Sequence, residues 1–282
     1  MKKFVAVLSA AAMMTTLAAC GSTADTTASS AAAEATASAA ESTADTAAKS
    51  YKVAIVQQLD HASLDEIRVA IEAELDAKAA EKGIAIEYKD FNGQNDATTL
   101  NQIGTQVVSD EYDAVIPIAT LAAQCMTTAC ESTKTPVIYA AISDPAAADL
   151  TDIDYVTGTS DALNTQSIMD MMFAVQPDIQ TVGLLYCSAE PNSVYQCDVI
   201  EGYLTQEGYT VARYAFTDTN DVTSVAQTAA DNSDVIYIPT DNTAASNTEA
   251  IANVVLPAKV PVVAGEEGIC KGCGVATLSI SY

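Results

Sequence analysis

The stretch VAIVQQLDHASLDEIRVAIEAELDAKAAEKGIAIEY (residues 53–88) decides the fold of this chain. Its two ends, Val53–Val56 and Ile84–Tyr88, are short apolar runs rich in β-branched residues, which predict strands. Between them, residues 63–82 repeat apolar side chains at helical spacing and stop at Gly83, a residue type that commonly closes a helix. A strand, a helix and a second strand in this order predict a parallel strand pair with the helix packed on one face.

The same alternation continues through the rest of the chain. Further short apolar runs predict strands over Ala114–Ile118, Val137–Ala141, Val182–Tyr186, Thr210–Phe216, Val235–Ile238, Val260–Ala264 and Val275–Ile280. Strands that alternate with helices predict parallel sheets covered by helices on both faces.

The pattern also occurs twice. Residues that punctuate turns recur at one offset of 125 positions: Gly83 with Gly208, Asn95 with Asn220, Asp96 with Asp221, and Pro136 with Pro261. We therefore expect two similar three-layer α/β/α lobes, the first over 51–158 and the second over 159–274. Residues Asp154–Asp161 are the expected first connection between the lobes, and residues 275–282 the expected strand that crosses back towards the first lobe.

The first 50 residues have the features of an exported, lipid-anchored end. Lys2 and Lys3 precede a short apolar run, which ends in the sequence LAAC at Cys20. This arrangement resembles the lipobox of bacterial lipoproteins, so we expect residues 1–19 to be a signal peptide and Cys20 to carry lipid and anchor the protein to the membrane. The alternative is an ordinary secretory peptide with an incidental cysteine. Residues 20–50, rich in Ala, Ser and Thr, are then expected to be a disordered tether.

Composition and motifs exclude several classes of function. The 282 residues include 12 Lys and Arg against 37 Asp and Glu, a formal net charge of −25, which disfavours binding to nucleic acid. One histidine, His61, argues against a multi-histidine metal site, and we expect His61 to be a surface loop residue. The chain has no P-loop, no G-x-S-x-G motif and no G-x-G-x-x-G after its first strand, so we do not expect an enzyme or a cofactor.

The loops that follow the predicted strands are polar and contain no Lys or Arg. In open α/β sheets ligands bind beyond the carboxyl ends of the strands. These loops are Gln57–Ser63, Ala119–Gln124, Ala141–Pro145, Cys187–Ser193, Pro239–Thr243 and Gly265–Gly268. A multiply charged anion fits them poorly, whereas a zwitterion fits well, because a helix start can hold its carboxylate and a desolvated carboxylate can hold its ammonium group.

Seven motifs in order carry a family resemblance. They are IVQQLDHASLD (55–65), IATLAAQ (118–124), AISDP (141–145), GTSD (158–161), LLYCSAEPNSV (184–194), YIPTDNT (237–243) and VAGEEG (263–268). From about Tyr51 to Tyr282 the chain resembles the substrate-binding lipoproteins of ABC importers, some of which bind tryptophan or tyrosine. The resemblance implies a type I periplasmic-binding-protein fold, a monomer on the bacterial cell surface, and delivery of a captured solute to a membrane permease.

The resemblance also implies site residues. Thr120, Ala122 and Ser143 match the side that holds a ligand carboxylate, and Asp241 matches the partner of the ammonium group. Further positions match groups that line the cleft: Asp144, Ser160, Ser188, Glu190, Asn192, Ser193, Thr240, Asn242 and Glu267. The expected ligand is an amino acid, with an aromatic side chain favoured. Phe91, Tyr139 and Tyr186 could stack on such a ligand, but aromatic residues at strand ends more often belong to the core. A sugar- or nucleoside-binding lipoprotein and a ligand-sensing surface receptor remain alternatives on the same fold.

Six cysteines remain besides Cys20, an even number that suggests disulfides in an exported chain. We expect Cys187 to pair with Cys197 and Cys270 with Cys273, and we regard Cys125 with Cys130 as a doubtful third pair because residues five apart on a helix point to different sides. A zinc site is the alternative at Cys270 and Cys273. Because relatives continue beyond the strand matching Val275–Ile280, we also expect this chain to be a truncated record.

Overall fold

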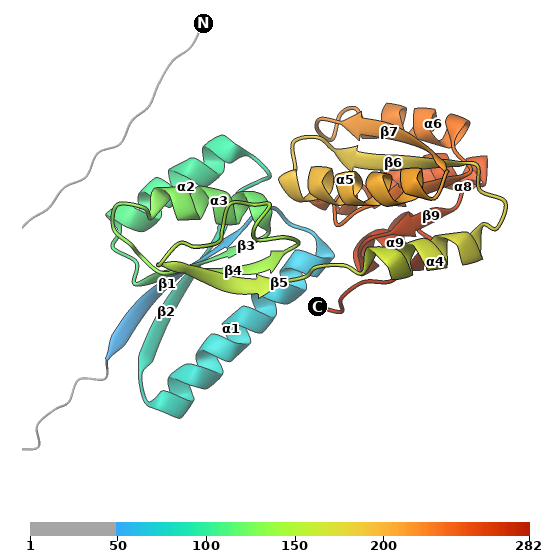
Figure 1. Ribbon diagram of the computed structural model, residues 1–282. Coiled ribbons are helices and arrows are strands. Elements are labelled where there is room, and N and C mark those ends of the chain that lie inside the picture. The colour runs from blue at the N-terminus through green and yellow to red at the C-terminus, as the bar shows by residue number, and fades with distance from the viewer. Residues whose placement is uncertain (1–48) are drawn as a thin grey trace, which may run out of the picture. The chain divides into compact units, whose positions relative to one another are not determined.

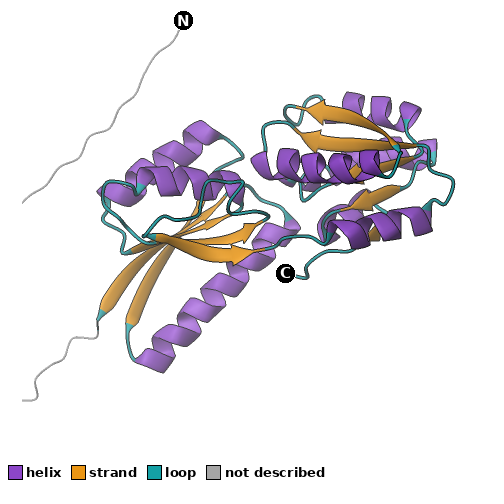
Figure 2. Cartoon of the chain, viewed as in Figure 1, coloured by secondary structure: helices purple, strands orange, loops and turns teal. Residues whose placement is uncertain are grey.

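The computed structural model describes residues 49–282, and these contain two parallel five-stranded sheets. The proposed signal peptide, lipid anchor and tether lie outside these residues, apart from the last two residues of the tether. Strands and helices alternate along the chain, as Figure 2 shows. The two-lobed α/β fold class predicted from the sequence is confirmed.

The first sheet has the strand order β2-β1-β3-β4-β5, and every neighbouring pair is parallel (Figure 1). Its elements are β1 (Ser50–Gln57), α1 (Ala62–Lys82), β2 (Ala85–Asn92), α2 (Ala97–Ser109), β3 (Ala114–Ile118), α3 (Thr120–Ala129), β4 (Val137–Ile142) and β5 (Val156–Ser160). Gly83 closes α1 in the left-handed conformation, with φ of 62°, as the sequence predicts.

Alternate side chains of the first sheet enter two different cores. Ala54 and Val56 on β1 pack with α2 and α3, whereas Ile55 packs with α1. This is the two-residue period of a strand that is buried on both faces. Figure 1 shows α1 on one face and α2 and α3 on the other.

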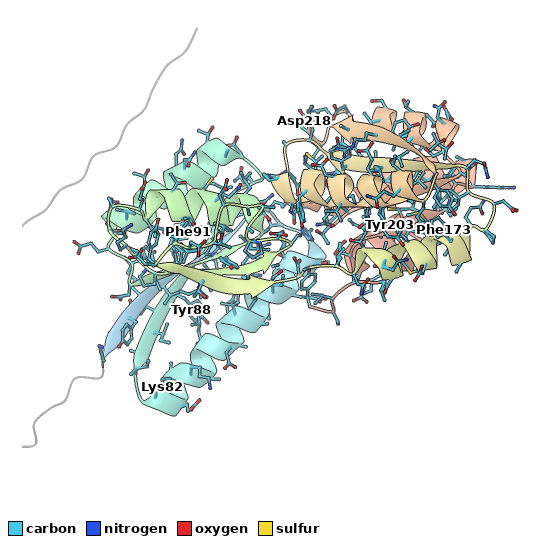
Figure 3. The ribbon with its side chains drawn as sticks, in the orientation of Figure 1. Lys82, Tyr88, Phe91, Phe173, Tyr203 and Asp218 are labelled. Carbon is cyan, nitrogen blue, oxygen red and sulfur yellow. The ribbon has the colours of Figure 1, made fainter. Side chains whose placement is uncertain are left out.

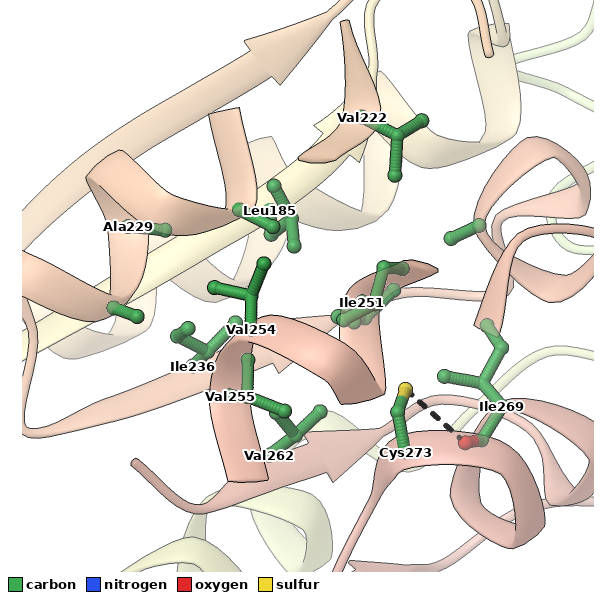
Figure 4. Packing of buried hydrophobic residues seen from close by; sticks show 14 of the residues in the cluster. Leu185, Val222, Ala229, Ile236, Ile251, Val254, Val255, Val262, Ile269 and Cys273 are labelled. Atoms are coloured by element: carbon green, nitrogen blue, oxygen red, sulfur yellow. Dashed lines mark hydrogen bonds between the residues drawn. The ribbon is translucent and has the colours of Figure 1, made fainter. Parts of the chain in front are cut away.

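The second sheet repeats this topology, with the strand order β7-β6-β8-β9-β10. Its elements are α4 (Thr165–Val175), β6 (Thr181–Cys187), α5 (Pro191–Gln206), β7 (Thr210–Phe216), α6 (Val222–Asn232), β8 (Val235–Ile238), α7 (Asn242–Ala245), α8 (Thr248–Ala258), β9 (Val262–Ala264), α9 (Glu267–Cys273) and β10 (Ala276–Thr277). Leu185 and Ile236 face α6 and α8, in the apolar cluster of Figure 4, while Leu184 and Tyr237 face α4 and α5.

The two connecting segments differ from the expectation. Residues 156–160 form β5, the fifth strand of the first sheet, so the chain leaves the first lobe only after Ser160. Ala276–Thr277 pair with β9 in the second sheet, where the sequence suggested a strand crossing back to the first lobe. β5 and β10 are edge strands of the two sheets. Both strands are short and carry few buried apolar side chains, so in the sequence they look like connecting segments.

Candidate functional site

A cavity of about 360 Å³ is lined by loops from both sheets. The first lobe contributes His61, Ser63, Leu64, Ala119, Thr120, Ala141, Ser143 and Asp161. The second contributes Asn192, Thr240, Asp241, Asn242, Ala245 and Glu266, and Tyr282 completes the lining. Nearly all of these residues follow the carboxyl ends of strands, the usual place for a ligand in open α/β sheets.

Three buried carboxyl groups line this cavity without a lysine or arginine beside them. Asp161, Asp241 and Glu266 are 5%, 0% and 3% exposed. The only side chain of the lining that can carry a positive charge is that of His61. Such an arrangement favours a ligand that brings its own positive charge.

Asp241 is the most buried of the three. Its Oδ2 accepts a hydrogen bond from the Cys187 backbone N–H at 2.6 Å, and its Oδ1 accepts one from the Ala244 N–H at 2.7 Å, which caps α7. Burial, and then the charge of Glu190, raises the pKa of this carboxyl above its ordinary value. Both oxygens therefore hold loops of the second lobe together.

Asp161 has a free oxygen. Its Oδ2 accepts a hydrogen bond from the Tyr282 hydroxyl, but its Oδ1 is buried with no hydrogen-bond partner among the described residues. Burial raises the pKa of this carboxyl. The Oδ1 of Asn192, in the same cavity, also has no partner there, while its Nδ2 donates to the Thr240 carbonyl at 2.7 Å. Two buried acceptors without donors call for a ligand that supplies N–H or O–H groups.

Glu266 joins the lobes at another wall of the cavity. Its carboxylate caps α9 at the Ile269 N–H and accepts a hydrogen bond from the Ser63 hydroxyl of the first lobe. The neighbouring Glu267, which the sequence predicts to line the cleft, is partly exposed and pairs with Lys271 at 2.8 Å. Glu266, the residue immediately before α9, lines the cavity, and its carboxylate caps this helix.

The start of α3 offers a place for a negative group. Thr120, the first residue of the helix, is 3% exposed and lines the cavity. Ala119 before it gives the helix no side-chain cap, although Gln58 Oε1 accepts from the Leu121 N–H at 3.0 Å. The partial positive charge of a helix start stabilises a carboxylate there.

Further hydrogen bonds join the two lobes around the cavity. His61 Nε2 lies 3.1 Å from Asn242 Oδ1, and the hydroxyls of Ser143 and Thr240 lie 3.1 Å apart. Asn95 Nδ2 donates to Thr243 Oγ1 at 2.8 Å. His61 lies in the loop before α1, as expected, but it is half-buried there and lines the cavity.

Several of the residues predicted from the sequence lie at the cavity and others do not. Thr120, Ser143, Asn192, Thr240, Asp241 and Asn242 line it. The others lie elsewhere: Ala122 in the core of the first lobe, Ser160 and Ser188 at exposed positions, Ser193 beside Asn192, and Asp144 in an adjoining pocket.

Glu190 is buried and does not line the cavity, but it holds the loop that follows β8 in place. Its two oxygens accept four hydrogen bonds, from the backbone N–H and side chains of Asn242 and Thr243, at 2.6–3.0 Å. A carboxylate with this many donors fixes the loop that carries Asp241.

The three aromatic residues at strand ends pack against other residues of their lobes, as the sequence favours, and none of them lines the cavity. Phe91 lies edge-on to Tyr112, with ring centroids 6.0 Å apart, in the first lobe (Figure 3). Tyr139 and Tyr186 are buried in apolar clusters of the first and second lobes.

The disulfide prediction is wrong: all six cysteines of residues 49–282 are free thiols. Cys187 belongs to the apolar cluster on one face of the second sheet and Cys197 to the cluster on the other face, so the sheet separates them. Cys273 is buried and its Sγ donates to the Ile269 carbonyl at 3.4 Å (Figure 4). No group of three or more His, Cys, Asp or Glu side chains in the described range could hold a metal ion.

Within residues 49–282, none of the helices combines the length and the apolar character needed to cross a membrane.

Known proteins similar to this chain have the same architecture. A curated tyrosine-binding protein of Clostridioides difficile is 30% identical over 240 residues, which cover 83% of this chain and 69% of that protein. The structure of an ABC domain from Streptococcus pneumoniae in complex with L-Trp has a TM-score of 0.76 and 30% identity, covering 83% of this chain and 80% of that one. A conserved domain protein of Vibrio cholerae has a TM-score of 0.75 and 27% identity, covering 81% and 78%.

The family model described as "ABC transporter substrate binding protein" matches residues 52–282, which contain both sheets except the first two residues of β1, and every residue of the cavity. The expectation of a type I periplasmic-binding-protein fold is confirmed by these relatives. The chain belongs to the family of ABC transporter substrate-binding proteins.

Proposed function

We propose that this protein captures a free amino acid, with an aromatic side chain favoured, in the cavity between its two sheets and delivers it to a membrane permease. The observation that carries the proposal is the pair of buried acceptors without donors, Asp161 Oδ1 and Asn192 Oδ1, in a cavity lined by three acids and by no lysine or arginine. An α-ammonium group supplies three N–H donors to acceptors that have none, and a positive charge to a cavity lined by three acids.

The remaining polar groups suit the other end of a zwitterion. The ligand carboxylate is assigned to the start of α3 at Thr120, with the hydroxyl of Ser143 nearby in the lining. Both oxygens of Asp241 already accept backbone hydrogen bonds, and a ligand ammonium group nearby would lower the raised pKa of this carboxyl and favour its charged form. The relatives support this ligand class, since one is named for tyrosine and another contains L-Trp.

Asp161→Asn tests the ammonium site. The variant keeps the shape of the side chain and removes its charge, so we expect the affinity for the amino acid to fall at least about thirtyfold, as when a buried charge loses its partner. Isothermal titration calorimetry measures the change, and Asp154→Asn, an exposed carboxyl in the loop before β5, is the matched control. Equal affinities in the two variants would remove Asp161 from the site.

A thermal-shift panel of amino acids, sugars and nucleosides tests the ligand class. Stabilisation by amino acids supports the proposal, because a ligand that binds only the native state raises its stability. Stabilisation by sugars or nucleosides alone would favour the sugar- or nucleoside-binding alternative. The sensory alternative predicts a gene neighbourhood with a membrane kinase instead of a permease and an ATPase.

The membrane anchor is part of the proposal and rests on the sequence around Cys20, outside the described residues. Two acyl chains hold a protein on a membrane far more stably than one. The mass of the mature N-terminal peptide tests it, since lipidation adds acyl mass to Cys20 and an ordinary secretory peptide does not.

A further inference from the structure

A second pocket adjoins the cavity and contains a buried hydroxyl without a partner. The pocket encloses about 440 Å³ and shares Ser143 with the cavity. Tyr237 of β8 lines it, is completely buried, and its hydroxyl has no hydrogen-bond partner among residues 49–282. Buried hydroxyls are nearly always hydrogen-bonded in native proteins, so this one is available to a bound molecule.

The walls of this pocket suit an aromatic ring. Leu163, Ile168, Val199 and Ile200 provide apolar side chains from α4, α5 and the segment before α4. The one carboxylate in the lining, that of Asp144, is already engaged by the Tyr195 hydroxyl at 2.6 Å and by two backbone N–H groups. The pocket therefore offers apolar walls and, at Tyr237, a buried hydroxyl without a partner among the described residues.

The pocket and the cavity are close enough to serve one ligand. Gln196 lines the pocket, and its Nε2 donates to the hydroxyls of Ser143, at 2.8 Å, and Thr240, both of which line the cavity. The same strand, β8, carries Tyr237 into the pocket and leads at its carboxyl end to Thr240 and Asp241. A ligand whose ammonium group lies at Asp161 can extend past Ser143 into the pocket.

We propose that this second pocket is the side-chain subsite, and that the Tyr237 hydroxyl recognises a polar group at the far end of an aromatic side chain, such as a phenol hydroxyl or an indole N–H. The inference rests on the proposed function, since it assumes an amino acid whose ammonium group occupies the cavity. A phenol or indole brings both a flat apolar ring for the walls and a hydrogen-bonding atom for Tyr237.

Calorimetry with L-tyrosine and L-phenylalanine on the wild-type protein and on Tyr237→Phe tests the hydrogen bond. The two ligands differ by one hydroxyl, as do the two proteins. We expect the wild type to prefer tyrosine about tenfold, the factor of one hydrogen bond of ordinary net strength, and Tyr237→Phe to lose this preference. Tyr214→Phe is the matched control, because Tyr214 packs on the opposite face of the same sheet.

A second variant tests occupancy without altering the buried hydroxyl. Val199 lies at the rim of the pocket and is 39% exposed, so Val199→Trp narrows the pocket without entering the core. We expect tyrosine affinity to fall at least tenfold, about the loss that separates a filled from a blocked subsite.

The outcomes separate the two proposals. Tyrosine binding that is equal in the wild type, Tyr237→Phe and Val199→Trp would overturn the subsite while leaving the amino-acid function intact. Binding of aliphatic but not aromatic amino acids would do the same. Failure of the wild type to bind any amino acid would instead overturn the proposed function.

Discussion

The carboxyl of Asp161, which the proposed function places beside the ligand, costs stability in the ligand-free protein. It is buried, one of its oxygens has no partner, and burial raises its pKa. A carboxyl with a raised pKa in the folded state resists ionisation, so folding becomes less favourable once the pH exceeds the pKa of the unfolded chain. The ammonium group of a ligand reverses this effect by pairing with the charge.

We therefore expect Asp161→Asn to raise the melting temperature of the ligand-free protein. The gain should be small near pH 4, where the carboxyl of the unfolded chain is only about half ionised, and should increase as the pH rises through the raised folded pKa. A gain of about 1 kcal/mol corresponds to about 2–4 °C for a chain of this size. Calorimetric scans from pH 4 to pH 8 measure it, and a lower melting temperature at every pH would show that the carboxylate is stabilising.

The buried thiols lead to a second prediction. Burial raises the pKa of Cys130 and of Cys187 to about 11, and it raises the pKa of Cys197 further. Thiolate is the reactive form, so we expect iodoacetamide to modify these residues very slowly in the native protein and rapidly after unfolding. Cys270, the least buried of the six, should react first. Peptide mass spectrometry measures the modification, and disulfide-linked peptides would contradict the structure.

Sequence reasoning identified those site residues that follow recognisable strands. Thr120, Thr240 and Asp241 come directly after strongly apolar runs, and the structure places them at the cavity. Asp161 was missed because the strand before it, VTGTS, has four exposed residues out of five and reads as a connection. The roles at Asp144 and Glu190 depend on hydrogen bonds from distant residues, which no local pattern reveals.

Strands and helices were predicted better than their pairings. Three strands, β3, β7 and β8, have the predicted bounds, because their apolar runs are sharply bounded by polar or turn residues. The strand order and register within a sheet could not be predicted from local patterns. The internal repeat predicts only that the two sheets are alike, and both do share one strand order. The disulfide prediction failed because cysteine number and export say nothing about which face of a sheet each thiol occupies.

The contact between β9 and the loop after β8 gives a prediction at Gly265. A β-carbon there would lie 2.7 Å from the Pro239 carbonyl carbon and 2.8 Å from the Thr240 backbone nitrogen. Gly265→Ala must therefore displace the loop that carries Asp241, at a cost of about 1–3 kcal/mol, and it should weaken ligand binding as well. Gly202→Ala is the control.

Gly202 lies on α5, and a β-carbon added there would have nothing within 4 Å of it. At this position the same substitution should stabilise by about 0.5–1 kcal/mol through helix propensity, without changing affinity. Thermal unfolding and calorimetry compare the two variants. If the two variants were equally stable, the backbone around Gly265 would accommodate a β-carbon without loss of stability.

The hydrogen bonds that join the lobes connect binding to closure. Asn95 is held by Gln58 Nε2 at 2.8 Å and donates in turn to Thr243, whose hydroxyl donates to Glu190. None of these four residues lines the cavity. They hold the two lobes together without lining the cavity, so ligand affinity should depend on them if binding requires the lobes to close.

Asn95→Asp tests this connection. The variant keeps the shape and the left-handed backbone of Asn95, whose φ is 53°, but replaces the donor to Thr243 with an acceptor. We expect affinity to fall about two- to tenfold and the ligand-free protein to scatter X-rays with a larger radius of gyration. Asn101→Asp, at an exposed position of α2, controls for the added charge. An unchanged affinity would show that closure does not depend on this bond.

The three acids around the cavity, with Glu190 behind them, also determine what the protein must leave in the medium. A dicarboxylic amino acid or a phosphorylated metabolite carries surplus negative charge into a space with no lysine or arginine to neutralise it. Under the proposed function, these carboxyl groups discriminate against glutamate, aspartate and sugar phosphates by repulsion, without any contact made for that purpose. Acidic nutrients in the surroundings would then compete only weakly with a neutral amino acid for the site.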